Sequence, residues 1–215
     1  MQIESVAFDM DGLMFNTEDV YWKCASVVLG QRGHEYTQEL CDQIMGRPPK
    51  FCFEKMIEYY GLDETWTDLR NESENVFIGL LDDGFDMMPG LLNLLEHLET
   101  ANIPKCVCTS SSRRVANEVL GRSNMLNRFD FVLASDDVVN GKPNPEIYEK
   151  AAGRFAISPE NMLVLEDSAS GCLAAKDSGA FVVAVLAEHN RNFDFSNASL
   201  IVSQLDDEKV LAFFQ

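Results

Sequence analysis

The chain has 215 residues, enough for one large domain or two modest ones, and 46% of them are hydrophobic, as in an ordinary globular protein. Its formal net charge of −18 argues against nucleic acids and anionic membrane surfaces as partners, because both recruit basic patches. No targeting segment opens the chain and no apolar run approaches a membrane span. We therefore expect a cytoplasmic protein whose six cysteines are reduced thiols.

The first predicted element is a buried strand that runs into a pair of acids. Residues 3–8 are largely apolar, as in a strand of a parallel sheet, and lead directly into Asp9-Met10-Asp11-Gly12. Residues two apart on an extended chain face the same side, so both carboxylates can point into one site, at the strand end where open α/β sheets bind ligands. Clustered carboxylates repel each other unless a cation or a shared proton intervenes, and of the two we favour a cation, for which their oxygen atoms suggest Mg²⁺. The alternative is an acidic surface turn, which the preceding apolar strand disfavours.

The next part of the chain, residues 16–86, has the period of helices and contains no convincing strand. Apolar residues recur every three or four positions, and turn signals such as Gly61 and Asp82-Asp83-Gly84 separate the segments. Four helices are predicted, at residues 17–30, 37–45, 51–60 and 64–81. We interpret this block as a helical insertion or a small second domain.

Beyond Pro89 the pattern changes to helices that alternate with short apolar strands. The predicted strands lie at residues 106–108, 131–134, 162–165 and 181–185, with a short edge strand at 200–202. One of the intervening helices is predicted to have Asn144 as its N-cap and Pro145 in its first turn. This alternation predicts a parallel sheet with helices on both faces, which the N-terminal strand must join.

Polar residues collect where the predicted strands end. Besides Asp9 and Asp11, they are Thr109 and Ser110, Asp136 and Asp137, Glu166 and Asp167, and, in a loop stiffened by glycine and prolines, Lys142. Carboxylates for a metal, hydroxyl and N–H groups for an oxyanion, and one lysine are the groups that phosphoryl transfer uses. An aspartate can then serve as the nucleophile, and a second acid can protonate the leaving oxygen.

Four short motifs in this order resemble those of the haloacid dehalogenase-like superfamily. They are Asp9-Met10-Asp11-Gly12, Thr109-Ser110, Lys142-Pro143 and Glu166-Asp167, and the helical block resembles that superfamily's α-helical cap. The resemblance spans essentially the whole chain. It implies an α/β fold with a Rossmann-like parallel sheet in residues 1–15 and 87–215, and an inserted all-α cap domain in residues 16–86. The motifs look closest to the branch that holds β-phosphoglucomutases and small sugar- or nucleoside-phosphate phosphatases.

The resemblance implies a role for each residue that would touch the phosphate. Asp9 would be the nucleophile and Asp11 the general acid and base. Ser110 and the backbone N–H of Ser111 would hold the transferring phosphoryl group, with Ser110 favoured over the neighbouring threonine. Lys142 would balance charge between Asp9 and the phosphate. Read singly, Lys142 could be a surface lysine and the serines an N-cap cluster, but the joint order of the motifs favours a site.

The same resemblance implies a Mg²⁺ site. Its ligands would be Asp9, Asp167 and the backbone carbonyl of Asp11, with Glu166 either a direct ligand or a residue that acts through one. Read alone, Glu166 and Asp167 could instead cap the helix that follows them. The histidines fit no motif, and we predict surface or structural positions for His34, His97 and His189.

Two departures from the branch's pattern bear on the reaction. Asn16 stands where the branch commonly has aspartate, a change that keeps hydrogen bonding but removes a charge. Tyr21 lies roughly where β-phosphoglucomutases carry a cap histidine, which favours a phosphatase over a mutase. In the predicted cap, Arg47 is a candidate for substrate binding because it precedes Pro48-Pro49 in a loop, although it could equally be a solvated loop charge.

The sequence therefore predicts a Mg²⁺-dependent phosphoric monoester hydrolase that acts on a small phosphorylated metabolite, a sugar or nucleoside phosphate, through an aspartyl-phosphate. One alternative is a β-phosphoglucomutase-like sugar phosphomutase. Another, from a different class, is a non-catalytic binding or regulatory protein on the same fold, which the retention of Asp9, Asp11, Lys142 and Asp167 disfavours. Neither nucleic acid nor a membrane is expected as a partner, and a monomer is favoured.

Overall fold

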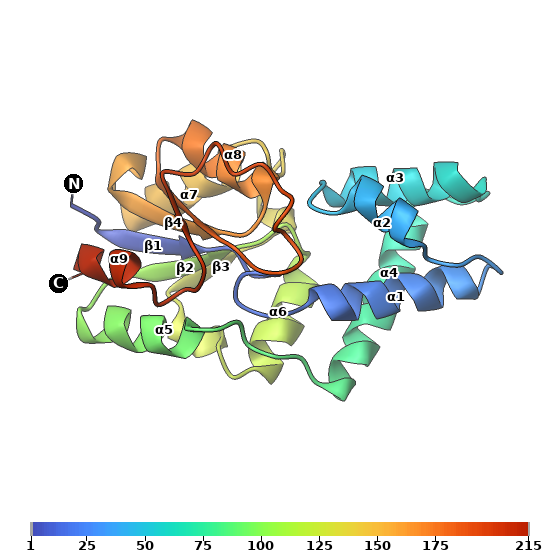
Figure 1. The fold of residues 1–215 in the computed structure, drawn as a ribbon, viewed down its shortest axis with the longest axis horizontal. Helices are drawn as coiled ribbons and strands as arrows, with labels where there is room; N and C mark the ends of the chain where they lie inside the picture. Colours follow the sequence, from blue (N-terminus) through green and yellow to red (C-terminus); the bar gives the residue numbers. More distant parts are fainter. Residues whose placement is uncertain (1, 215) are drawn as a thin grey trace. The chain divides into compact units, whose positions relative to one another are not determined.

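The computed structural model describes residues 2–214, and the chain divides into two compact units. The residues up to Phe15, together with those from Met87 onward, form one unit, which we call the α/β unit (Figure 1). Asn16–Asp86 form the other, which we call the helical unit. Each unit is described by itself.

The α/β unit is built on a six-stranded sheet in the order β3-β2-β1-β4-β5-β6, and every paired neighbour runs parallel. The strands are β1 (Ser5–Phe8), β2 (Lys105–Cys108), β3 (Phe131–Leu133), β4 (Met162–Glu166), β5 (Phe181–Val185) and β6 (Leu200–Val202). Helices separate successive strands from β1 to β5 along the chain, because a parallel pair needs a crossover connection. The predicted Rossmann-like α/β fold is confirmed, including the short edge strand.

Helices cover both faces of the sheet (Figure 1). They are α5 (Leu91–Thr100), α6 (Arg113–Arg122), α7 (Glu146–Phe155), α8 (Ala169–Ser178) and the short α9 (Glu208–Leu211). The face that carries Ala7 and Val164 packs against α7 and α8 through buried residues such as Tyr148 and Cys172. On the other face lie α5 and α6, and there the Phe8 ring meets Phe129 edge-on at 5.5 Å. Burial on both sides explains why the central strands are apolar throughout.

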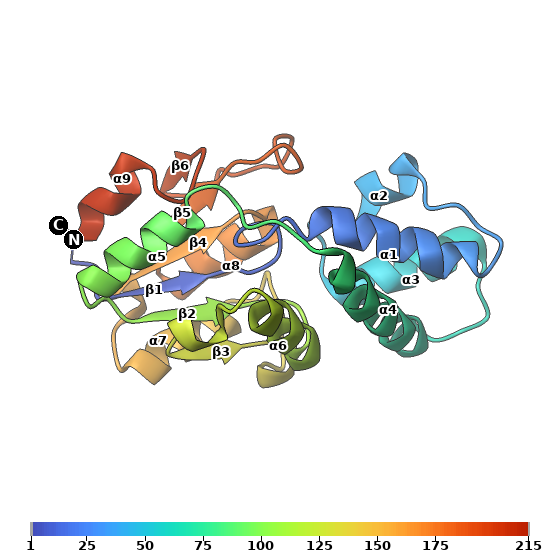
Figure 2. The ribbon, with the colours of Figure 1, turned by 90° about the horizontal axis from the view of Figure 1, so that it is seen from below.

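The helical unit contains α1 (Glu18–Gly30), α2 (Gln38–Ile44), α3 (Pro49–Tyr60) and α4 (Trp66–Leu80). Helices α1 and α4 lie side by side (Figure 2), and the rings of Tyr21 and Phe77 are 4.4 Å apart between them. Short 3₁₀ turns complete the secondary structure: η1 (Leu81–Asp83) in this unit and η2 (Leu126–Arg128), η3 (Ser135–Asp137), η4 (Pro159–Asn161) and η5 (Ala212–Phe214) in the α/β unit.

Several helices begin one or two residues away from their predicted starts, among them α4, which begins at Trp66 rather than at residue 64. Helix α3 begins at Pro49 rather than at residue 51, because a proline at the first helical position loses no hydrogen bond that the helix would make. Helix α7 begins at Glu146, and Pro145 is its N-cap residue. Asn144 still acts as a cap, since its Oδ1 accepts a hydrogen bond from the Glu146 N–H at 3.0 Å.

The two connections between the units pair with each other. Phe15 and Met87 form an isolated antiparallel bridge, and the Met88 N–H donates to the carbonyl of Met14 at 2.9 Å. On the other side of the boundary, the Asn16 N–H donates to the carbonyl of Asp86 at 2.9 Å. The inserted segment therefore leaves and re-enters the α/β unit at adjacent points.

All six cysteines are free thiols, five of them buried. Within residues 2–214, no helix combines the length and the apolar character that crossing a membrane requires.

Candidate active site

The centre of the site is the end of β1, where the order of the strands reverses. Strand β1 pairs with β2 on one side and with β4 on the other, so successive connections run in opposite directions from this point. Open α/β sheets bind ligands outside the carboxyl ends of the strands at such a switch point. Asp9 follows β1 there, and its N–H still donates to Leu165 of β4 at 3.0 Å. Asp167 follows β4, so the two acids leave neighbouring strands.

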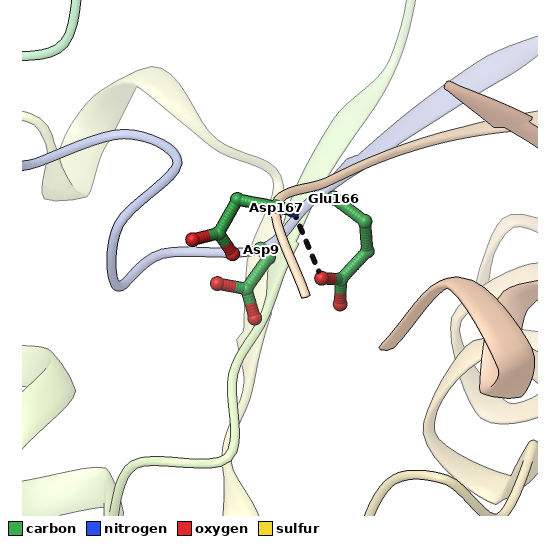
Figure 3. Close-up of side chains that lie close together, drawn as sticks. All are labelled: Asp9, Glu166 and Asp167. Carbon is green, nitrogen blue, oxygen red and sulfur yellow. Dashed lines mark hydrogen bonds between the residues drawn. The ribbon is translucent and has the colours of Figure 1, made fainter. Parts of the chain in front are cut away.

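Three buried acids converge at this edge of the sheet (Figure 3). Asp9, Glu166 and Asp167 each offer a carboxylate oxygen, and these atoms all lie within 4.8 Å of one another. Burial raises the pKa of Asp9 well above its usual range; Lys142 opposes this rise, whereas Glu166, Asp167 and Asp11 add to it. Oxygen donors with excess negative charge suit a hard divalent cation such as Mg²⁺.

Within residues 2–214, Lys142 is the lysine that pairs with these acids. Its Nζ lies 2.5 Å from Oδ1 of Asp9, 2.6 Å from Oε1 of Glu166 and 2.9 Å from the carbonyl of Cys108, so all three ammonium hydrogens have acceptors. Burial alone would lower the lysine's pKa, but the carboxylates of Asp9 and Glu166 outweigh it and the pKa is raised. Lys142 is therefore charged and fixed in place, rather than a surface lysine.

Glu166 has hydrogen-bond donors on both carboxylate oxygens. Oε1 accepts from Lys142 and from the hydroxyl of Tyr148, each at 2.6 Å. Oε2 accepts from the N–H of Asp167 at 3.1 Å and from the N–H and hydroxyl of Ser168 at 3.2 and 3.0 Å. These bonds occupy the lone pairs that a metal would need, so of the two expected roles for Glu166 they favour the indirect one.

Asp11 is held by hydroxyl groups that follow β2. Its Oδ2 accepts from Oγ of Ser111 at 2.8 Å and from Oγ1 of Thr109 at 3.2 Å. Thr109 is completely buried and also accepts the Ser111 N–H at 3.0 Å, so its hydroxyl is committed to the protein. Ser110 lies half-buried in the turn between them, and its role as the phosphoryl-binding hydroxyl stays a prediction. In this arrangement the Ser111 N–H is occupied by Thr109.

Two glycines allow the acids to come this close. Gly12 has a φ of 77°, and a Cβ there would lie 2.2 Å from Oδ2 of Asp167 and 3.0 Å from Nε2 of His189. A Cβ at Gly171 in α8 would lie 1.8 Å from Oε1 of Glu166. Both positions therefore require glycine for the carboxylates to occupy their places.

Comparison with known proteins identifies the family of this chain. The model of the haloacid dehalogenase-like hydrolase family matches residues 6–185. The chain belongs to this family. It is 34% identical over 215 residues to a Drosophila melanogaster protein named "Probable pseudouridine-5'-phosphatase", a match that covers 97% of this chain and 92% of the relative. It is also 34% identical over 181 residues to the "Phosphorylated carbohydrates phosphatase" of Thermotoga maritima, covering 82% of each chain.

Solved structures share the fold of this haloacid dehalogenase-like hydrolase. The structure of CbbY from Rhodobacter sphaeroides in complex with phosphate superposes with a TM-score of 0.88 and covers 99% of both chains at 22% identity. Its fold is therefore the same. The predicted family and the predicted class, a phosphoric monoester hydrolase, are confirmed.

Not every polar strand end contributes to the site of the hydrolase. Asp136 and Asp137 follow β3 but bind Arg113: Oδ2 of Asp136 accepts its N–H at 2.6 Å, and Asp137 pairs with its guanidinium. Asp137 also accepts the Ala134 N–H at 2.7 Å. Arg47 lies in the helical unit with its guanidinium 5.7 Å from the Phe51 ring centroid, and its role in substrate binding stays a prediction.

Two residues beside the site of the hydrolase escaped the sequence analysis. Tyr148, which donates to Glu166, is one member of the buried stripe of α7. His189, predicted to be a surface or structural residue, lies with its Nε2 2.8 Å from Oδ2 of Asp167. The sequence carries one weak signal for it, since His189 lies four residues beyond the end of β5 and so near the same edge of the sheet.

Proposed function

We propose that this protein is a Mg²⁺-dependent phosphatase that hydrolyses a small phosphomonoester through an aspartyl-phosphate on Asp9. The observation that carries the proposal is the buried set of Asp9, Lys142 and Asp167 at the switch point of the sheet. A serine or cysteine hydrolase would need a nucleophile beside a histidine base instead.

In the first half of the reaction, a carboxylate oxygen of Asp9 attacks phosphorus while the ester oxygen leaves. Asp11 gives its proton to the leaving oxygen, so that the product departs as a neutral alcohol. Ser110 donates its hydroxyl to the phosphoryl group. Lys142, 2.5 Å from Asp9, offsets negative charge at the point where the nucleophile meets the phosphate dianion.

In the second half, water attacks the phosphorus of the aspartyl-phosphate. Asp11, now a carboxylate, takes a proton from that water, and the P–O bond to Asp9 breaks to release inorganic phosphate. The hydroxyls of Thr109 and Ser111 hold one oxygen of Asp11 in both steps. The residues return to their starting protonation states.

We assign the metal to Asp9, Asp167 and the carbonyl of Asp11, with Glu166 acting indirectly through Lys142. When bound there, Mg²⁺ would neutralise carboxylate charge and orient the phosphate oxygens. The excess of buried carboxylates over the single lysine supports this assignment.

For the substrate, we propose a sugar or nucleoside monophosphate, with the helical unit acting as a cap and Arg47 contacting the part of the substrate beyond the phosphate. The names of the relatives, which specify pseudouridine 5'-phosphate and phosphorylated carbohydrates, support this choice. We also propose a cytoplasmic location, supported by the free thiols of all six cysteines.

A panel of phosphomonoesters tests the proposal. It contains an aryl phosphate, several sugar phosphates and pseudouridine 5'-phosphate, and phosphate release is measured with Mg²⁺ and after chelation. We expect turnover that chelation abolishes and that Asp9→Asn lowers by at least about 10³-fold. The matched control, Asp63→Asn, changes an exposed aspartate of the helical unit and keeps full activity.

Each contrary result contradicts a different part of the proposal. Full activity in Asp9→Asn excludes the aspartyl-phosphate. Activity that survives chelation excludes the metal. Isomerisation of a hexose 1-phosphate, stimulated by its bisphosphate, identifies a mutase, and an intact protein that hydrolyses no ester of the panel is a binding protein.

A further inference from the structure

The loop that follows β5 is fixed against the residue that follows β4. Asn190 is completely buried, and its Nδ2 donates to the carbonyls of Asp167 at 2.9 Å and Val185 at 3.0 Å. Its Oδ1 accepts the N–H of Ala187 at 2.8 Å. Because each polar atom of this side chain has a partner, the loop cannot shift without breaking buried hydrogen bonds. The adjacent residue, His189, is therefore held at a defined place.

From that place His189 reaches the Asp167 carboxylate. Nε2 lies 2.8 Å from Oδ2, and the two side chains are 15% and 8% exposed. An ionised carboxylate can only accept, so the imidazole donates this hydrogen bond through Nε2. Gly12 lies beside both groups, since a Cβ there would come within 2.2 Å of Oδ2 and 3.0 Å of Nε2. The bare backbone turn at Gly12 thus leaves the room in which the imidazole and the Asp167 carboxylate meet.

His189 contacts the acid cluster from outside it. Among residues 2–214, the ligand atoms that lie within 4.8 Å of one another belong to Asp9, Glu166 and Asp167, and His189 is not a member of that set. Its hydrogen bond to the cluster is the one to Asp167. This geometry fits a hydrogen bond to a metal ligand better than a fourth ligand.

We propose that His189 is the positioning residue that orients the Asp167 carboxylate for the divalent cation, and that the loop fixed by Asn190 exists to place it. The inference rests on the proposed Mg²⁺-dependent function. Carboxylates that bind metals are commonly held by such partners, and loss of one typically weakens metal binding by about 10–100-fold. His189 does not touch the reacting atoms, so it acts only through Asp167.

Calorimetric titration of Mg²⁺ into the intact protein and three variants tests the proposal. His189→Ala removes the donor, whereas His189→Gln places an amide N–H near the position of Nε2. Arg191→Ala changes an exposed neighbour in the same loop, whose guanidinium lies 2.5 Å from Oε1 of Glu188. We expect the Mg²⁺ dissociation constant to rise about 10–100-fold in His189→Ala and less than about 3-fold in the other two.

Thermal unfolding, measured with and without Mg²⁺, separates a positioning role of His189 from a role in folding stability. A positioning role predicts that His189→Ala lowers the Mg²⁺-induced rise in Tm and that His189→Gln restores it. If His189→Ala binds Mg²⁺ as tightly as the intact protein, the inference is wrong while the phosphatase proposal stands. If the intact protein binds no Mg²⁺ but hydrolyses esters, the metal-dependent mechanism fails and the inference fails with it.

Discussion

The α/β unit and the helical unit place their charged side chains differently. In the α/β unit, three acids and a lysine, Asp9, Glu166, Asp167 and Lys142, are buried together at one strand edge. In the described part of the helical unit, no acid, lysine or arginine is buried, and its ion pairs are partly exposed. Charges that are buried cost free energy unless they are paired, so their retention in one unit supports the proposal that this unit carries the chemistry.

The largest expected effect comes from breaking the buried charge set with Lys142→Met. The change leaves Asp9 and Glu166 without their shared cation, so we expect the free energy of unfolding to fall by about 3–5 kcal/mol and turnover to cease. Urea unfolding and phosphate release measure the two effects. Lys150→Met is the control, because Lys150 pairs with Glu146 while 44% exposed and its loss should cost at most about 1 kcal/mol. Equal losses in the free energy of unfolding of the two variants would contradict the claim that the buried pair contributes more than the exposed one.

A smaller effect, confined to catalysis, is expected from Asp11→Asn. The amide oxygen can still accept from Thr109 and Ser111, but the amide cannot protonate a leaving group. We expect kcat/KM to fall by about 10²–10⁴-fold on an alkyl phosphate, and by much less on an aryl phosphate whose phenolate leaves unaided. Steady-state kinetics on the two esters measure the ratio. Equal losses on both would show that Asp11 does not protonate the leaving oxygen.

Tyr148→Phe tests whether the neutral hydrogen bond to Glu166 contributes to stability in addition to its ion pair with Lys142. It removes one donor from a buried carboxylate and leaves Lys142 in place, so we expect a loss of about 1.5–3 kcal/mol in the free energy of unfolding. Burial, and to a lesser extent the charge of Glu166, raises the pKa of the Tyr148 hydroxyl. The hydroxyl therefore keeps its proton at neutral pH and donates the hydrogen bond. Denaturant unfolding measures the free energy of unfolding of Tyr148→Phe and of the exposed control Tyr59→Phe. Equal values would show that the hydrogen bond from Tyr148 to Glu166 does not stabilise the fold.

The smallest effect belongs to the helical unit. Arg32 lies 2.6 Å from both Glu64 and Glu72, with 17% of its side chain exposed. Arg32→Gln should lower the free energy of unfolding by about 1 kcal/mol and leave hydrolysis of a small aryl phosphate unchanged. The pair of Lys55 with Glu58 is more exposed and supplies the control, Lys55→Gln. A loss of aryl phosphatase activity in Arg32→Gln would show that the two units do not divide stability and chemistry as described.

The fold could be predicted because its main patterns are local in the sequence. They are the helical spacing of apolar residues, the short apolar runs of the strands and the polar residues where the strands end. Residues 3–8 and 162–165 could be recognised as buried strands, and the acids that follow them had to share an edge of the sheet. The roles of Asp9 and Asp11 came from the family motifs and stay predictions until they are tested.

What the sequence could not predict depends on contacts between distant segments. Tyr148 looks like any apolar position on α7, and only the packing of that helix brings its hydroxyl to Glu166. His189 and Asp167 are 22 positions apart, and the path of a loop alone brings them together. The choice between Thr109 and Ser110 likewise depended on which hydroxyl the sheet buries, which a short apolar run does not specify.

The paired connection between the units has a consequence for how this protein could be rebuilt. Because Phe15 and Met87 already bridge each other, the residues where the inserted segment begins and ends are neighbours. Closing a chain between adjacent points depends only weakly on the length of the loop, at about 0.6 kcal/mol for each doubling. The α/β unit can thus exchange the whole helical segment for another one, or for a short turn, without re-routing its sheet. The proposal that the helical unit contacts the substrate then predicts that such an exchange changes substrate choice and leaves Asp9 and Asp167 in place.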